Sequence, residues 1–332
     1  AFHVSSLYSP WVPWTRVVAE FLGSRDSLTG QMDFSNNWLG EPFEEQLAKV
    51  EANLFVQKAQ RGSPRGIAPT WAKFILAAAD TGGDHAWFTV RAWGAGMRSR
   101  LLDWGKVYSL DELYQRTLAT RFQVEGDSRP PQGVDLLVVD SGGTRTVDDG
   151  SRTDEVYRFS MRDPRIAPIR GNLIAAQKSG KPINSRRITY RPPGGQPPYD
   201  VVLNLLDVNY YKDVLAARLR ERVEGEDADL WQEASTIDEE YCRQMVAEHR
   251  VVIREGRRLK AQWQPLSKGL PNHFWDCSVY QCAAAEMIRV DMLASFAAPV
   301  ERAVREENTK PRVQEKKPLT APGGKPFLAS RR

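Results

Sequence analysis

The middle of the chain alternates between strand-like and helix-like patterns of apolar residues. The segments that predict strands are 71–79, 86–93, 100–107, 134–139 and 166–169. The first and fourth are almost continuously apolar and each stops at an aspartate, as expected for strands buried on both faces of a sheet. Helices are expected between the later strands, with Ser109 and Thr153 as their N-cap residues. The pattern therefore predicts a mixed α/β sheet flanked by helices.

The chain beyond residue 171 has a different pattern. Residues 181–198 are rich in Pro, Gly and Arg and predict an irregular excursion from the sheet. Four further elements are expected after it: helices around 209–223 and 236–248, a hairpin over 250–263, and a long helix from 271 to about 296. From residue 301 onward the chain is polar and rich in Lys and Pro, a composition that predicts disorder.

The N-terminal part differs in composition from the sheet region. It is rich in aromatic side chains and ends in an amphipathic helix expected over 44–60, and Gly and Pro within 61–66 predict a linker. The expected organisation is a helical N-terminal segment over 1–66, an α/β domain over 67–300 and a disordered basic tail over 301–332.

Composition and charge exclude several classes of protein. The 332 residues include 46 Lys and Arg and 42 Asp and Glu, a formal net charge of +4. No apolar stretch approaches the roughly 20 residues that span a bilayer, and nothing at the start of the chain predicts secretion. The three cysteines lack metal-ligand spacing, which argues against a disulfide framework or a zinc site and fits a reducing compartment. The tail holds nine Lys and Arg against four Asp and Glu, so the rest of the chain is close to neutral.

Two aspartates occupy equivalent places at the ends of predicted strands. Asp80 and Asp140 each follow an apolar strand and precede a pair of glycines, and sites in α/β sheets form at the carboxyl ends of strands. Asp276 shares a helix face with Val279 and Tyr280, and a carboxylate on such an apolar face needs a partner. Three carboxylates suit a pair of Mg²⁺ or Mn²⁺ ions acting on a phosphodiester. The alternative is that Asp80 and Asp140 are turn residues and Asp276 pairs with an arginine.

Several segments of the chain identify a family by their order and spacing together, although each segment alone is a weak signal. They are 1–14, 36–45, 79–80, 139–143, 153–157, 211–213, Trp263 and 272–280. With them the chain resembles the nuclease portion of bacteriophage terminase large subunits of the lambda-type GpA family. The resemblance implies an RNase H-like fold whose acids lie on the first strand, a later strand and the C-terminal helix, which here are Asp80, Asp140 and Asp276. It also implies two-metal hydrolysis that cuts concatemeric viral DNA during packaging.

The resemblance further implies partners and a location. The expected partners are double-stranded DNA, a terminase small subunit, a portal protein and an ATPase domain in a longer or a separate chain, at the phage assembly site in the host cytoplasm and without a membrane. This chain lacks a G-x-x-x-x-G-K-[ST] motif, and residues 1–45 resemble the end of such an ATPase domain. Two other interpretations remain open: a cellular resolvase or repair nuclease with an RNase H-like fold, and a catalytically silent packaging-assembly module.

Further residues are candidates for supporting roles. Asp154 is a candidate additional metal ligand, although the acidic insert with Asp148 and Asp149 makes its alignment uncertain. His273 stands where the family has an acid, so it is expected either to contact a metal ligand or to be a surface residue at a helix N-terminus. Residues 164–199 contain no Asp or Glu, and their cations predict salt-dependent DNA binding, the alternative being a solvated loop. The cations chosen are Arg170, Lys178, Lys181, Arg186, Arg187 and Arg191.

Overall fold

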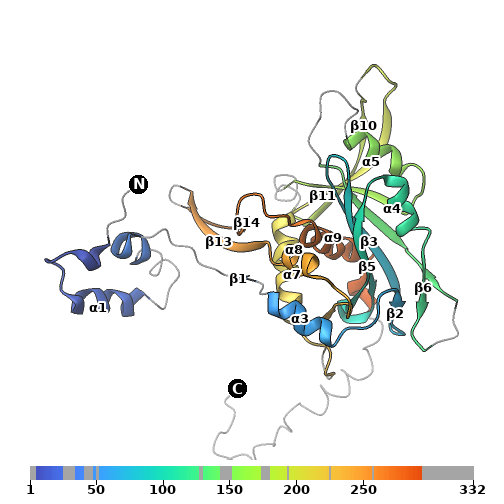
Figure 1. Ribbon diagram of the computed structural model, residues 1–332. Helices are drawn as coiled ribbons and strands as arrows, with labels where there is room; N and C mark the ends of the chain where they lie inside the picture. The colour runs from blue at the N-terminus through green and yellow to red at the C-terminus, as the bar shows by residue number, and fades with distance from the viewer. Residues whose placement is uncertain are drawn as a thin grey trace, which may run out of the picture. The chain divides into compact units, whose positions relative to one another are not determined.

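An eight-stranded mixed sheet organises the part of the chain that the computed structural model describes (Figure 1). The described residues are 5–24, 34–40, 48–49, 52–126, 130–142, 152–172, 180–192, 194–223, 226–255 and 258–293. The strands are β3 (Phe74–Thr81), β4 (Ala86–Trp93), β5 (Ser99–Val107), β8 (Leu136–Asp140), β9 (Ile166–Gly171), β10 (Ile183–Tyr190), β11 (Tyr199–Leu206) and β12 (Trp231–Gln232). Their order in the sheet is β10-β11-β9-β8-β3-β4-β5-β12, which confirms the predicted mixed α/β class.

The direction of the strands places two predicted acids at one edge of the sheet. β3, β4 and β5 form an antiparallel meander, whereas β8 runs parallel to β3, and β9 and β11 continue in that direction. Ala79 of β3 is paired with Val139 of β8, so the next residues, Asp80 and Asp140, lie side by side at the carboxyl ends of neighbouring strands. The nearly continuous apolar character of both strands follows from their central position, where both faces are covered.

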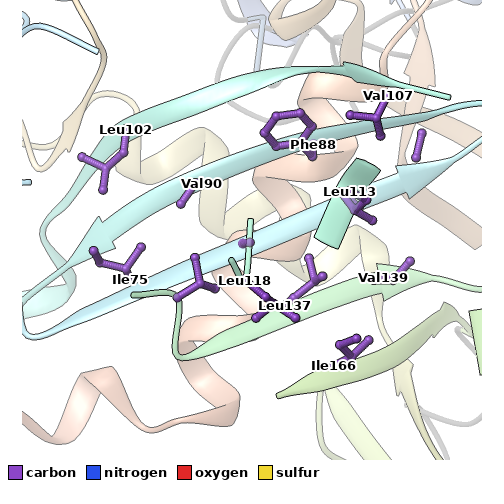
Figure 2. Packing of buried hydrophobic residues seen from close by; sticks show 14 of the residues in the cluster. Ile75, Phe88, Val90, Leu102, Val107, Leu113, Leu118, Leu137, Val139 and Ile166 are labelled. Atoms are coloured by element: carbon purple, nitrogen blue, oxygen red, sulfur yellow. The ribbon is translucent and has the colours of Figure 1, made fainter. Parts of the chain in front are cut away.

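One face of the sheet packs against α4 (Leu110–Arg116) and α5 (Arg152–Ser160). Figure 2 shows Phe88, Val90 and Leu137 of the strands with Leu113 of α4 in one buried cluster. The predicted N-cap of α4 is confirmed, because the Ser109 hydroxyl accepts a hydrogen bond from the Glu112 N–H at 3.0 Å. Helix α5 begins one residue before the expected cap, and the Thr153 hydroxyl donates instead to the Ser141 carbonyl.

The other face carries α9 (His273–Met287), which is covered in turn by α7 (Val208–Arg218) and α8 (Glu239–Met245) (Figure 1). Because α9 lies between the sheet and these helices, its residues from Phe274 to Ala285 are buried on every side apart from a partly exposed Asp276, not on one face as predicted. The side-chain amide of Gln281 donates to the carbonyls of Leu76 and Thr89, which fixes the helix to β3 and β4. The helix ends at Met287, earlier than expected, where Arg289 takes a positive φ of 60°.

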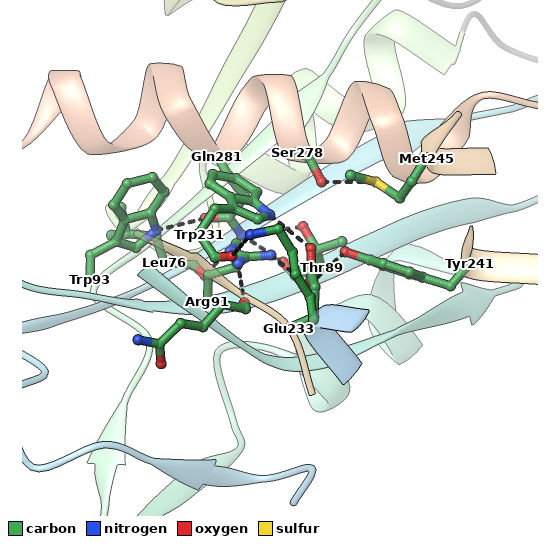
Figure 3. Close-up of polar contacts among 12 residues, drawn as sticks. Leu76, Thr89, Arg91, Trp93, Trp231, Glu233, Tyr241, Met245, Ser278 and Gln281 are labelled. Atoms are coloured by element: carbon green, nitrogen blue, oxygen red, sulfur yellow. Dashed lines mark hydrogen bonds and ion pairs between the residues drawn. The ribbon is translucent and has the colours of Figure 1, made fainter. Parts of the chain in front are cut away.

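A buried ion pair joins β4 to β12 and α8 (Figure 3). The guanidinium of Arg91 donates to the Glu233 carboxylate at 3.1 Å, and neither side chain is exposed to solvent. The same carboxylate accepts from the Trp231 indole at 2.8 Å and from the Tyr241 hydroxyl at 3.1 Å. These hydrogen bonds satisfy a carboxylate that would otherwise be costly to bury. The segment after α7 is thereby held against the sheet.

The remaining elements include two small sheets, β1-β13-β14 and β2-β6-β7. Their strands are β1 (Ala48–Lys49), β2 (Ile67–Ala68), β6 (Arg121–Val124), β7 (Gln132–Gly133), β13 (Glu248–Glu255) and β14 (Arg258–Pro265), the last two forming the predicted hairpin. The helical elements are η1 (Ser6–Tyr8), α1 (Trp14–Ser24), η2 (Phe34–Leu39), α3 (Ala52–Gln60), η3 (Ala95–Met97) and η4 (Val290–Met292). Among the described residues, no helix combines the length and apolar character needed to cross a membrane.

Two segments expected to be irregular are ordered in the structure. The expected linker at 61–66 is packed, because Ser63 bridges to Ala234 and a Cβ on Gly62 would lie 2.6 Å from the Glu233 carbonyl. The excursion expected at 181–198 contains the edge strand β10, paired with β11 along its whole length. Within the range 44–60 predicted as a helix, the described residues form the short strand β1 at 48–49 and the helix α3 at 52–60. The tail lies outside the described residues, and the expected domain boundaries at 66 and 300 stay predictions.

Candidate active site

The three aspartates chosen from the sequence converge at one edge of the sheet. Asp80 lies near the end of β3, Asp140 is the last residue of β8, and Asp276 is in the first turn of α9. The Asp80 carboxylate contributes to a raised pKa at both other acids, and Asp140 contributes to the raised pKa of Asp276. The geometry agrees with this: Asp80 and Asp140 follow paired residues of β3 and β8, and α9, which packs on both strands, places His273 at 2.7 Å from Asp80. The fold therefore assembles acids that are 136 and 60 residues apart in sequence.

A specific partner holds the carboxylate of each strand-end acid. Oδ2 of Asp80 lies 2.7 Å from Nδ1 of His273. Oδ2 of Asp140 accepts a hydrogen bond from the Gly142 N–H at 3.1 Å. A Cβ on Gly142 would lie 3.2 Å from both carboxylate oxygens of Asp140, so the glycine leaves room for this close approach. These contacts fix the orientation of both acids.

Asp276 belongs to a polar network that the sequence did not predict. Its Oδ2 accepts from the side-chain amide of Asn272 at 2.9 Å, and its Oδ1 lies 3.5 Å from Nζ of Lys212. Glu248 joins the same groups: its carboxylate is 2.6 and 2.8 Å from the Lys212 ammonium and 2.7 Å from the Asn272 amide. Lys212 and Asn272 lie in segments that carry the family resemblance, which was a usable signal. Glu248 is the first residue of β13, although the sequence predicted the end of a helix there, and nothing in its local sequence distinguishes it.

Burial and neighbouring negative charges shift the pKa values of the acids in the site. Burial raises the pKa of Asp140 to about 7, with the neighbouring Asp80 adding to the effect and Arg170 opposing it. Burial also raises the pKa of Asp276, against the opposing effect of Lys212 and with further increases from Asp80 and Glu248. Burial alone would lower the pKa of Lys212, but the carboxylates of Asp276 and Glu248 raise it overall. The site therefore has more buried negative charge than its own cations neutralise.

Aromatic rings form a wall beside Asp80. The His273 imidazole stacks on the Trp87 indole, with ring centroids 5.4 Å apart and planes inclined by 6°. His85 lies edge-on to both rings, and its Nδ1 is 2.6 Å from the carboxylate of Asp84. The stacking restricts His273 to the position from which it reaches Asp80. His273 thus contacts a predicted ligand and is also the partly exposed first residue of α9, so it has features of both interpretations of the sequence.

The donor set is suited to a hard divalent cation. Mg²⁺ and Mn²⁺ prefer carboxylate oxygens, and a bound cation would offset the repulsion that raises the pKa values of Asp140 and Asp276. As the side chains stand, no three His, Cys, Asp or Glu side chains in the described part of the chain form a group ready to hold a metal ion. Lys212, Asn272 and His273 contact carboxylate oxygens at this edge instead.

The other predicted residues lie around this edge. Both carboxylate oxygens of Asp154 are engaged away from the three aspartates, Oδ1 by the Tyr199 hydroxyl at 2.7 Å and Oδ2 by Nε of Arg158 at 2.9 Å. Arg170, at the end of β9, is close enough to Asp140 to lower its pKa. The exposed cations are Lys181, next to β10, Arg186 and Arg187 on that strand, and Arg191 directly after it. Lys178, Asp148 and Asp149 lie outside the described residues.

Comparison with known proteins identifies a family. The model of the terminase large subunit gpA endonuclease domain matches residues 1–295. The chain is 23% identical over 327 residues to the terminase large subunit of Enterobacteria phage P21, covering 95% of this chain and 48% of that protein. It is also 23% identical over 299 residues to the terminase large subunit of Escherichia phage lambda, covering 85% and 43%. The chain thus spans less than half the length of both relatives. No solved structure matches it.

Proposed function

The chain belongs to the family of endonuclease domains of the terminase large subunit gpA, and we propose that it is a metal-dependent endonuclease that cleaves double-stranded DNA. The observation that supports this most directly is the convergence of Asp80, Asp140 and Asp276 from β3, β8 and α9. Because both matched relatives are phage terminase large subunits, the substrate we propose is concatemeric viral DNA during packaging. The proposed partners are a terminase small subunit, a portal protein and an ATPase domain.

The order of the elements supports an RNase H-like fold for this domain. An antiparallel meander, β3-β4-β5, is followed by β8 and β9, which extend the sheet in parallel on the other side of β3. The acids lie on the first of these strands, on a later strand and on the last long helix. This is the distribution that the resemblance implies for such a nuclease.

In the proposed reaction the chain's residues hold the acids and the DNA in position. Asp80, Asp140 and Asp276 would hold two Mg²⁺ or Mn²⁺ ions, which supply positive charge to the attacking and leaving oxygens of a phosphodiester. His273, stacked on Trp87, keeps the Asp80 carboxylate oriented. Arg170 favours the ionised form of Asp140, which is the form that a cation requires.

The outermost strand of the sheet, β10, offers cations for the DNA backbone. Arg186, Arg187 and Arg191 are exposed on or directly after β10. Phosphate contacts from such residues provide affinity that does not depend on base sequence. We therefore assign these three arginines to DNA binding.

Cleavage of supercoiled plasmid by the purified protein tests the proposal. With Mn²⁺ or Mg²⁺ present we expect nicked and linear products, and with EDTA we expect none. Replacing Asp80 or Asp276 with Asn removes a carboxylate while preserving its shape, so we expect cleavage to fall by at least about a hundredfold. The matched control is Asp227→Asn, because the Asp227 side chain is 97% exposed and pairs only with Arg222 among the contacts described; this variant should cleave normally.

Three outcomes would contradict the proposal. Undiminished nicking by Asp80→Asn would show that the acid cluster is not the active site. A wild-type protein that folds and binds DNA but never cleaves it with either metal would favour a silent assembly module. A strong preference for branched over linear DNA would instead favour the resolvase interpretation.

A further inference from the structure

A buried lysine lies within the acid cluster. Lys212 on α7 has only 11% of its side chain exposed, and Glu248 on β13 has 5%. The lysine ammonium makes two short contacts with Glu248, at 2.6 and 2.8 Å, and a longer contact of 3.5 Å with Oδ1 of Asp276. The two carboxylates therefore share one cation unequally.

The pairing requires three separate elements to meet. Lys212, Glu248 and Asp276 come from α7, β13 and α9, which are brought together only in the folded chain. Taking a lysine and a glutamate out of water is costly unless each finds a partner. Asn272 completes the arrangement, since its amide contacts Glu248 at 2.7 Å and Asp276 at 2.9 Å. Glu248 is thus held from two sides, whereas the lysine reaches Asp276 only over the longer distance.

We propose that Lys212, anchored by Glu248, is an internal counter-ion for Asp276 that a divalent cation displaces from this carboxylate. This inference rests on the proposed function, because it concerns the same acids. Glu248 and Asn272 are positioning residues: Glu248 holds the ammonium through its two short contacts, and the Asn272 amide holds Oδ2 of Asp276. In the metal-free protein the lysine offsets part of the repulsion among the acids. When a cation binds, the lysine keeps its short contacts with Glu248 and gives up the long one.

Two variants separate this inference from the alternative that Glu248 is itself a metal ligand. In Glu248→Gln the lysine loses its anchor and becomes free to pair with Asp276, so Mn²⁺ should bind about tenfold more weakly. In the double variant Lys212→Met, Glu248→Gln the net charge of the site is unchanged, but the competitor for Asp276 is gone. We expect the double variant to bind Mn²⁺ about tenfold more tightly than the wild type. A ligand role for Glu248 predicts weaker binding in both variants.

Calorimetric titration of the metal-free full chain with Mn²⁺ measures these affinities directly. Thermal unfolding with and without Mn²⁺ gives a second readout, because a ligand stabilises the folded state in proportion to the logarithm of its concentration over Kd. The control is Lys73→Met, which removes an exposed cation just before β3, at the end of the strand opposite Asp80, and should leave the Mn²⁺ affinity unchanged.

The outcomes distinguish this inference from the proposed function. Unchanged or weaker Mn²⁺ binding by the folded double variant overturns the inference, whatever the nuclease assay shows. Tighter binding by the double variant supports it, even if the wild type binds Mn²⁺ without cleaving DNA; that result would contradict only the proposed function. If neither protein binds Mn²⁺, both ideas fail.

Discussion

At single residues among the clustered acids, the charge that metal binding requires opposes the stability of the fold. Asp140 is a clear case, because burial and Asp80 raise its pKa from 3.8 to about 7. A carboxyl group whose pKa is higher in the folded than in the unfolded chain stabilises the fold fully below about pH 3.8, and this contribution is lost as the pH rises through about 7. At neutral pH and above, the ionised carboxylate that a metal needs is therefore unfavourable for the metal-free fold.

We expect Asp140→Asn to stabilise the metal-free protein while abolishing cleavage. The amide oxygen can still accept from the Gly142 N–H, but no charge is buried beside Asp80. Thermal unfolding in EDTA should show a melting temperature a few degrees above wild type at pH 8, and a difference that shrinks towards pH 5. Asp227→Asn, at an exposed site, should show no such pH-dependent difference. A lower melting temperature for Asp140→Asn at pH 8 would contradict the assigned cause.

The same residues show what the sequence reveals about a site. Asp80 and Asp140 were recognisable because each interrupts an apolar strand just before a glycine pair. Glu248 was not, because its role depends on a contact between α7 and β13 that no local pattern encodes; Lys212 had only the resemblance of its segment to mark it. His273 is an intermediate case. The sequence shows that it stands where the family has an acid, but its stacking on Trp87 depends on the packing of α9 against β4. Residues that interrupt a pattern can be found from sequence, whereas those that pair across the fold cannot.

Secondary-structure elements follow the same division between local and long-range causes. The strand over 86–93 and the N-cap at Ser109 were predicted correctly, because periodicity and capping are local properties. Strand β10 was missed since Pro and Gly flank it and arginines occupy its exposed positions. Its inward residues Ile188 and Tyr190 pack against the buried cluster around Tyr157, so tertiary packing decided the structure of this segment.

Strand β10 should act as a DNA-binding element. Replacing Arg186, Arg187 and Arg191 together with Gln removes three exposed cations and keeps Ile188 and Tyr190, the residues of β10 that pack on the buried cluster. We expect weaker binding to linear duplex DNA and a salt dependence of log Kd that is smaller by up to about 3, since each phosphate contact contributes about 0.9. Filter binding or fluorescence anisotropy over a range of salt concentrations measures both.

A matched control for this variant lies at the other end of the sheet. Arg222 is about half exposed and pairs with Asp227 near β12. Its replacement with Gln should change neither the DNA affinity nor the salt slope. If the triple variant on β10 retains the wild-type slope, then the backbone contacts lie elsewhere and the assignment to this strand is wrong.

The whole molecule has a small net charge that is unevenly distributed. Residues 301–332 hold nine Lys and Arg against four Asp and Glu, so the other 300 residues are close to neutral although the full chain has a charge of +4. The acids of the sheet edge concentrate negative charge at the place that DNA must approach. Cations elsewhere on the chain are therefore needed to bring a polyanion to this edge, and they act through long-range attraction that salt screens.

Removing residues 301–332 should weaken DNA capture without removing the chemistry. Asp80, Asp140 and Asp276 all precede the deletion, so metal-dependent nicking should persist at low salt, where fewer cations suffice to hold the DNA. As salt increases, the truncated chain should lose cleavage at a lower concentration than the full chain. Plasmid nicking across a salt series, with Mn²⁺ saturating, compares the two chains. Equal salt sensitivity would show that the cations around the sheet edge suffice, and loss of nicking at every salt concentration would show that the C-terminal residues contribute to the active site itself.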